Sequence, residues 1–359
     1  MGEVSELERL ISIRIIQEDV ETISSLLANE RNPIFAMEII PYFALFIQSY
    51  QEYMGESFLS ESEAIKIKDI RNHIKYYADT FGKSKRKISS VDQDQDSSFR
   101  SQLRFDFLKR WNIHLNLGTY WTDDRRIVGN TQQLAGFLGM NNIFDSDVRQ
   151  MQYELGYQIG SFVASVRDEL AKSFSPPVVN RAGTSVAIKY YYDINTNKQN
   201  ILFGNDKSKE LSLFFLHLLC NMNFTKYVLM PLFPDGNIWI FRIEYIVTYY
   251  TFRALQRLRN YCENNSDVKI ELKEINEILR GGEGVFKSKF RNCMMHYNLE
   301  NQSVLSSEKI QRPFFGIVEN CFEGMDYYTY LNTIRNLSDR IIAYLEKQFN
   351  CSSVKLQRL

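Results

Sequence analysis

Residues 281–299 read GGEGVFKSKFRNCMMHYNL, a glycine-rich break followed by an amphipathic pattern. Three glycines within residues 281–284 disfavour a helix there, so the pattern predicts that a helix begins after them and covers residues 285–299. The apolar positions of this helix recur at helical spacing and form one stripe: Phe286, Phe290, Cys293 and Tyr297. The stretch therefore predicts a helix that buries one face and keeps polar side chains beside it.

An arginine and a histidine lie on the two sides of this apolar stripe. Four residues separate Arg291 from His296, and Asn292 follows the arginine. An α-helix turns by about 100° and rises by about 1.5 Å per residue. Asn292 and His296 therefore lie one above the other, and Arg291 is roughly 7.5 Å from His296 along the axis. Imidazole titrates near neutral pH and guanidinium is always cationic, so the pair suits proton transfer on a phosphodiester.

This pattern of arginine, a polar residue, three variable residues and histidine resembles the motif of the HEPN superfamily of small helical ribonuclease domains. Arg291, Asn292 and His296 match it position by position, and Tyr297 is a common companion after the histidine. The resemblance covers the motif helix and, by helical pattern alone, residues 205–349. It implies that Arg291, Asn292 and His296 are catalytic residues.

The resemblance also implies an activity and partners. The activity is that of a metal-independent endoribonuclease, in which the 2′-hydroxyl of RNA attacks the neighbouring phosphate and leaves 2′,3′-cyclic phosphate and 5′-hydroxyl ends. The implied partners are RNA and a second copy of the chain in a homodimer, and an antitoxin or regulatory protein is a further candidate. The implied setting is that of a bacterial toxin or phage-defence effector.

Three further residues near the motif are candidate substrate-binding residues. They are Lys287, Lys289 and Tyr297, of which the lysines would form a local positive patch, although a solvated helix face explains them equally well. A second class of function stays open: a non-catalytic helical module that binds RNA, a nucleotide or a partner protein. A closed, apolar setting of His296 would favour that second class.

The composition of the whole chain predicts a mainly α fold. Of 359 residues, 43 are basic and 43 acidic, so no global field favours nucleic acid, and any RNA contact must come from a local patch. Aromatic residues make up 14% and proline is scarce, which favours long helices with thick cores. We expect a helical region over 1–175 and, over 176–359, a helical bundle of HEPN type with a β-hairpin insertion.

The hairpin is the only strand signal that we identify in the sequence. Tyrosines and β-branched residues in Ser185–Tyr192 and Lys198–Phe203 flank an Asn-rich turn. By contrast, Ser89–Ser98 is polar and of low complexity, which predicts a mobile loop. The segment Arg71–Tyr76 parallels the motif with tyrosine in place of the histidine, and is either a degenerate second copy or a coincidence.

Cysteine usage and hydropathy favour a cytoplasmic protein. The five cysteines are scattered without Cys-x-x-Cys pairs, which is typical of reduced thiols and not of a zinc site. No apolar run reaches 18 residues, so no membrane span is expected. Neither a metal nor a cofactor is expected.

Overall fold

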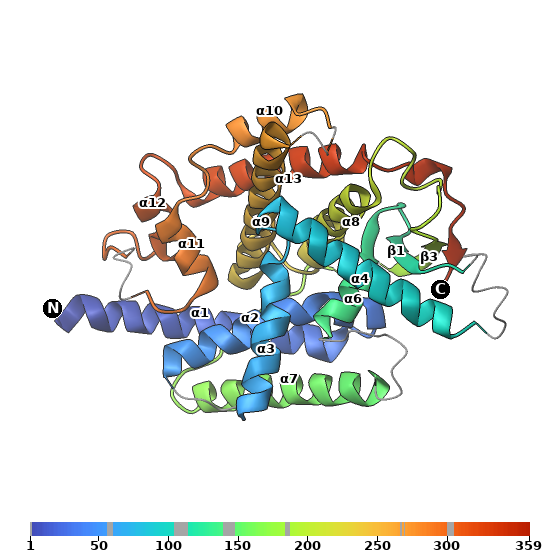
Figure 1. Ribbon diagram of the computed structural model, residues 1–359. Helices are drawn as coiled ribbons and strands as arrows, with labels where there is room; N and C mark the ends of the chain where they lie inside the picture. The colour runs from blue at the N-terminus through green and yellow to red at the C-terminus, as the bar shows by residue number, and fades with distance from the viewer. Residues whose placement is uncertain are drawn as a thin grey trace.

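The computed structural model is mainly helical (Figure 1). It describes residues 2–55, 60–103, 114–138, 148–183, 187–265, 268, 270–299 and 305–359. The α-helices are α1 (Gly2–Asn29), α2 (Pro33–Met54), α3 (Glu61–Asn72), α4 (Phe81–Ser101), α6 (Thr131–Phe137), α7 (Val148–Ala171), α8 (Lys209–Asn223), α9 (Ile238–Asn264), α10 (Lys273–Gly281), α11 (Ser288–Met295), α12 (Ile317–Cys321) and α13 (Tyr327–Glu346). Short 3₁₀ or π segments are η1 (His73–Lys75), η2 (Phe224–Leu229), η3 (Met230–Leu232), η4 (Pro313–Gly316) and η5 (Cys351–Ser353).

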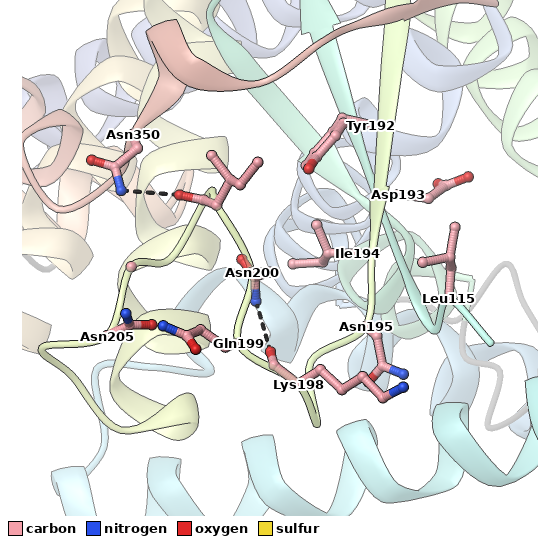
Figure 2. A pocket seen from close by; sticks show the side chains of 12 residues that line it. Leu115, Tyr192, Asp193, Ile194, Asn195, Lys198, Gln199, Asn200, Asn205 and Asn350 are labelled. Atoms are coloured by element: carbon pink, nitrogen blue, oxygen red, sulfur yellow. Dashed lines mark hydrogen bonds between the residues drawn. The ribbon is translucent and has the colours of Figure 1, made fainter. Parts of the chain in front are cut away.

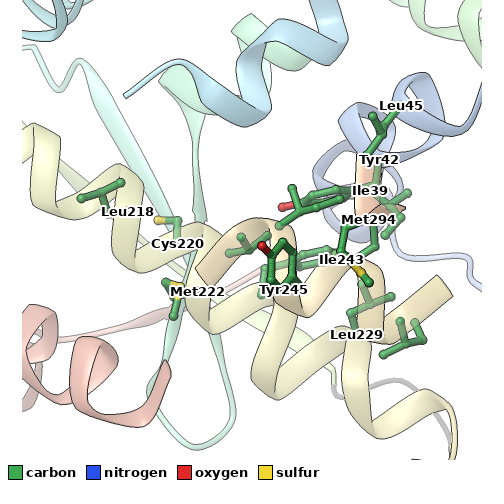
Figure 3. Packing of buried hydrophobic residues seen from close by; sticks show 14 of the residues in the cluster. Ile39, Tyr42, Leu45, Leu218, Cys220, Met222, Leu229, Ile243, Tyr245 and Met294 are labelled. Carbon is green, nitrogen blue, oxygen red and sulfur yellow. The ribbon is translucent and has the colours of Figure 1, made fainter. Parts of the chain in front are cut away.

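Helix α9 runs through the middle of the molecule and organises the packing (Figure 1). It contacts α1, α4, α8, α10, α11 and α13, and so joins elements from both ends of the chain. Buried side chains of α2, α8, α9 and α11 belong to one hydrophobic core, which includes Tyr42, Leu218, Tyr245 and Met294 (Figure 3). Residues from both 1–175 and 176–359, the two regions expected from the sequence, belong to this one core.

Two core helices have the length and composition of a membrane span. They are α2 and the segment Lys209–Leu232, which comprises α8, η2 and η3. Within the fold, 72% and 78% of their apolar windows are buried, which is the burial expected of core helices.

The sheet differs from the predicted hairpin. Its strands are β1 (Leu117–Thr122), β2 (Ile127–Asn130), β3 (Ile188–Ile194) and β4 (Gln357–Arg358), in the order β2-β1-β3-β4 with antiparallel neighbours. The first predicted arm largely coincides with β3, although residues 185 and 186 lie outside the described part. The second arm, 198–203, is wrong: it forms turns, and β3 pairs with β1 and β4 instead.

The Asn-rich turn after β3 explains this difference. The Asn195 amide donates to the carbonyl oxygen of His114 at 2.8 Å, and the Thr196 backbone N–H donates to Asn116 Oδ1 at 2.8 Å. Because these contacts tie the turn to the segment before β1, β3 is aligned with β1. The hairpin of the fold is therefore β1–β2, in a region where no strand was expected.

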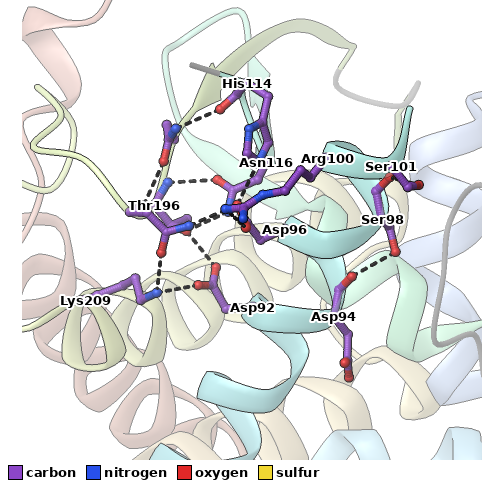
Figure 4. A network of polar contacts seen from close by, with 12 residues as sticks. Asp92, Asp94, Asp96, Ser98, Arg100, Ser101, His114, Asn116, Thr196 and Lys209 are labelled. Atoms are coloured by element: carbon purple, nitrogen blue, oxygen red, sulfur yellow. Dashed lines mark hydrogen bonds and ion pairs between the residues drawn. The ribbon is translucent and has the colours of Figure 1, made fainter. Parts of the chain in front are cut away.

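The polar segment Ser89–Ser98 is not a loop, so that prediction was wrong. It lies within α4, and its residues Asp92 and Asp96 are buried, one helical turn apart, in a polar network (Figure 4). Asp92 Oδ1 accepts from Thr196 Oγ1 at 2.8 Å, and Asp92 pairs with Lys209 at 2.7 Å. The polar groups of this segment are satisfied by residues distant in sequence, which local composition does not reveal.

Replacement of Asp92 by alanine should lower the free energy of unfolding by about 3 kcal/mol, because Lys209 and Thr196 lose their buried partner. Asp94→Ala is the matched control, since Asp94 lies on the exposed face of the same helix, and should change the free energy of unfolding by less than about 0.5 kcal/mol. Urea unfolding of both variants measures the difference. Equal effects would show that the network does not stabilise α4.

Candidate functional site

The motif helix is shorter than predicted. Helix α11 begins at Ser288, after Gly284 with φ of +77°, and ends at Met295, so that His296 is extended with φ of −136° and ψ of 158°. Two side chains from other helices donate hydrogen bonds to the last carbonyl oxygens of α11. Arg242 Nε donates to that of Met294 at 3.0 Å, and Ser49 Oγ donates to that of Met295 at 2.7 Å. These tertiary donors end the helix before the histidine.

A buried ionic cluster fixes the chain directly after the helix. Tyr297 is buried, its hydroxyl donates to Asp19 Oδ2 at 2.5 Å, and the Arg242 guanidinium lies 4.6 Å from the centre of its ring. Arg242 and Asp19 form a buried ion pair. Burial raises the pKa of Asp19 to about 6, although Arg242 and the Tyr297 hydroxyl both act to lower it. The Tyr297 side chain is thus buried and bonded within the fold, and its substrate-binding role stays a prediction.

With Tyr297 held in the core, the neighbouring His296 faces outward and meets a carboxylate. His296 Nδ1 lies 2.9 Å from Glu52 Oε2, and the two side chains are 40% and 45% exposed. The other oxygen, Glu52 Oε1, accepts from Gln48 Nε2 at 2.7 Å. The hydrogen bond from His296 holds the pKa of Glu52 below its usual range, with a smaller contribution from the charge of Arg71.

The contact with Glu52 determines which ring nitrogen can react. An ionised carboxylate only accepts hydrogen bonds, so Nδ1 carries the proton and Nε2 of His296 keeps its lone pair. Glu52 also stabilises the imidazolium that forms when Nε2 takes a proton. The sequence gives no sign of this role, because Glu52 lies 244 positions before His296 in a different helix.

A cavity of about 280 Å³ opens at this pair. Its lining residues are mostly polar: Ser49, Glu52, Tyr53, Asn292, His296, Tyr297 and Asn298. Asn292 Oδ1 accepts from Arg291 Nη2 at 2.6 Å, and Asn292 lines the cavity whereas Arg291 does not. The structure thus brings Asn292 and His296 to one cavity, and Arg291 is linked to it only through its hydrogen bond to Asn292.

The two candidate lysines lie elsewhere. Lys287 is exposed, its Nζ donates to the carbonyl oxygen of Cys321 at 3.0 Å, and it covers the ring of Phe322. Lys289 is also exposed, in the first turn of α11. His296 follows the opposite end of that helix, roughly 10 Å away along the axis. Neither lysine lines the cavity at His296.

The other histidines have different roles. All four histidines of the chain lie in the described part. Burial lowers the pKa of His217 to about 3 and that of His73 to about 4, so both rings are neutral at physiological pH. His114 is buried and bonded to Asp96 at 2.8 Å. Only His296 combines exposure with a carboxylate partner.

A larger cavity of about 670 Å³ lies beside the end of β3 (Figure 2). Its lining includes several amides, but they already serve the fold: Asn350 donates to the carbonyl oxygen of Ile201 at 2.9 Å, and Asn195 to that of His114. No histidine, cysteine or arginine lines it. The smaller cavity at His296 therefore has more of the groups that acid–base chemistry needs.

Comparisons with protein-family models, with curated proteins and with solved structures found no match. Among the described residues, no group of three or more His, Cys, Asp or Glu side chains is arranged to hold a metal ion.

Tyr297→Phe should destabilise the fold by about 1–2 kcal/mol at pH 8, because Asp19 loses a hydrogen bond to its charged form. The folded-state pKa of Asp19, about 6, exceeds the ordinary 3.8. The ionised carboxylate is therefore costly in the fold, and protonation relieves that cost as the pH falls below 6. Because the Tyr297 hydroxyl stabilises the ionised form, the loss should shrink towards pH 5.

Urea unfolding at both pH values tests this expectation, with Tyr328→Phe as control because Tyr328 is exposed. A loss that is the same at pH 5 and pH 8 would contradict the assignment of the hydroxyl to ionised Asp19.

Proposed function

We propose that this protein is a metal-independent endoribonuclease of the HEPN type, with His296 as its proton-transfer group. The observation that carries the proposal is the Glu52–His296 pair at the rim of an open, polar cavity that Asn292 also lines. The half-exposed setting of His296 favours catalysis over the alternative, a non-catalytic helical module that binds RNA, a nucleotide or a protein.

In this proposal, Nε2 of His296 takes the proton of the RNA 2′-hydroxyl. The 2′-oxygen then forms a bond to phosphorus while the bond from phosphorus to the 5′-oxygen breaks, and the 5′-oxygen takes a proton from a protonated histidine on the opposite side of the phosphorus. Glu52 keeps the imidazole in the required tautomer and stabilises the imidazolium. The leaving oxygen lies on the opposite side of the phosphorus, where the homodimer implied by the resemblance would place His296 of the partner subunit.

Arg291 is suited to hold the phosphoryl oxygens as negative charge grows on them. The residue is half-buried, and among the described residues its side chain bonds only Asn292 Oδ1 and pairs with no carboxylate. Its Nε is buried without a hydrogen-bond partner. A permanent cation in this state can accept an anion without first breaking an ion pair. Asn292, which lines the cavity, orients Arg291 through this hydrogen bond.

His296→Ala and Arg291→Ala should each reduce cleavage of single-stranded RNA by about 10²- to 10⁴-fold in the presence of EDTA, and the two losses should not add, since both disable one step. Asn292→Ala should cost less, because water can replace an orienting amide. The products of the wild type should carry cyclic-phosphate ends, seen by mass spectrometry. Arg280→Ala, which removes an exposed arginine outside the cavity, is the control.

A requirement for Mg²⁺, or full activity of His296→Ala, would refute the proposed mechanism. Binding of RNA by a wild type that does not cleave it would support the non-catalytic module instead.

Glu52→Gln should lower kcat by about 10- to 100-fold and leave KM nearly unchanged, because Glu52 acts on His296 and not on the substrate. The carboxylate is half-exposed, so water screens part of its effect and the loss stays below that of His296→Ala. Glu283→Gln, an exposed neighbour of α11, is the control. Unchanged kcat in Glu52→Gln would remove Glu52 from the mechanism.

A further inference from the structure

A strongly charged cavity of about 600 Å³ lies where the start of α10, the end of α13 and the segment before α8 meet. Of its ten lining residues in the described part of the chain, three are lysines and four are aspartate or glutamate. Its volume lies within the roughly 300–1,000 Å³ of small-ligand sites. It shares no lining residue with the cavity at His296, so a ligand here would not depend on the candidate active site.

The charged groups of this cavity do not all neutralise one another. Lys207 pairs with Asp206 at 2.7 Å, and Lys347 pairs with Glu274 at 2.5 Å. The side chains of three other lining residues have no hydrogen bond or ion pair with the described part of the chain: Glu271, Lys273 and Glu277. The cavity therefore offers one unpaired cation and two unpaired carboxylates.

Tyr344 of α13 also lines the cavity, and its hydroxyl has no partner. The residue is only 3% exposed, and its hydroxyl is buried without a hydrogen bond. Its ring packs edge-on against Phe215, with the ring centres 5.8 Å apart. Burial raises the pKa of Tyr344, so the hydroxyl keeps its proton and can donate. Because a buried hydroxyl without a partner is unfavourable, this group indicates that an acceptor is supplied by a ligand.

The N-terminus of α10 adds further hydrogen-bond donors to the cavity. Lys273 and Glu274, the first two residues of the helix, both line the cavity. The preceding residue, Leu272, makes no side-chain cap, and no backbone carbonyl in the described part accepts from the N–H groups of Lys273 and Glu274. Such a helix start carries a partial positive charge and favours an anionic group.

We infer that this cavity binds a free amino acid with a basic side chain, for which L-lysine is the probe. The carboxylate of the ligand lies at the N-terminus of α10, where Lys273 and the Tyr344 hydroxyl donate to it. Its two ammonium groups pair with Glu271 and Glu277. One carboxylate and two ammonium groups match the unpaired charges of the cavity one for one, and they give the Tyr344 hydroxyl its acceptor.

Other ligands of similar size would leave charges unmatched. An anion such as phosphate would meet two unpaired carboxylates, and a diamine would leave Lys273 and Tyr344 without an acceptor. A divalent metal ion is also unsuited, because among the described residues no group of three or more His, Cys, Asp or Glu side chains is arranged to hold one.

The test is isothermal titration calorimetry of the full chain with L-lysine and two analogues that each lack one group. Cadaverine lacks the carboxylate, and 6-aminohexanoate lacks the α-ammonium group. L-lysine should bind, and each analogue should bind about tenfold more weakly or worse, because its absence leaves a charged group of the cavity unpaired. No heat from L-lysine at millimolar concentration, or equal affinity for cadaverine, would overturn the inference.

Two variants assign the contacts. Tyr344→Phe should weaken binding of L-lysine about tenfold, while its unfolding in urea should stay as in the wild type or shift to higher urea, because the variant removes a buried hydroxyl without a partner. Glu277→Gln should also weaken binding about tenfold. Because Glu277 is exposed, this variant keeps the fold and tests the site even where Tyr344→Phe does not fold.

Tyr328→Phe and Glu323→Gln are the matched controls, since both residues are exposed and neither lines the cavity. Affinity for L-lysine should be unchanged in both. Wild-type affinity in Glu277→Gln, or in a folded Tyr344→Phe, would refute the assigned contacts and with them the site.

Discussion

The buried pairing of Asp19 with Arg242 and Tyr297 is the constraint on which the candidate site depends. It joins α1, α9 and the chain directly after α11 in a setting where none of the three groups can reach water. Loss of one partner would leave an uncompensated buried charge, so the three segments are held in one arrangement. Arg242 also donates a hydrogen bond to the carbonyl oxygen of Met294. This bond ends α11, so that His296 faces outward.

Because of the same constraint, the candidate site is built from residues of both halves of the chain. His296 and Arg291 come from the C-terminal half, whereas Glu52 and Asp19 come from helices α2 and α1. The core is continuous between these helices and α9. A fragment over 176–359 would keep the motif but lose both the carboxylate that orients the imidazole and the one that anchors Tyr297. The motif therefore gains its geometry only within the whole fold.

This dependence explains what the sequence could and could not predict. Helical class and the start of α11 after the glycines follow from local rules, as does one strand near β3. The end of α11 could not be predicted, because it is set by Arg242 and Ser49, which come from other helices. The helical state of Ser89–Ser98 was hidden for a similar reason, since Thr196 and Lys209 satisfy Asp92 from far along the chain. The role of Glu52 likewise depends on tertiary packing alone.

The balanced charge of the whole chain also gives no information on which charged groups are paired locally. Equal numbers of acidic and basic residues argue against a general affinity for nucleic acid. Within the fold, however, arginines such as Arg242 and Arg335 pair with nearby carboxylates, whereas Arg291 pairs with none among the described residues. Glu52, the carboxylate of the candidate site, is hydrogen-bonded to His296. Because charge is paired unevenly, a chain with no net charge can still carry, at Arg291, a guanidinium group that has no carboxylate partner in the described part of the chain.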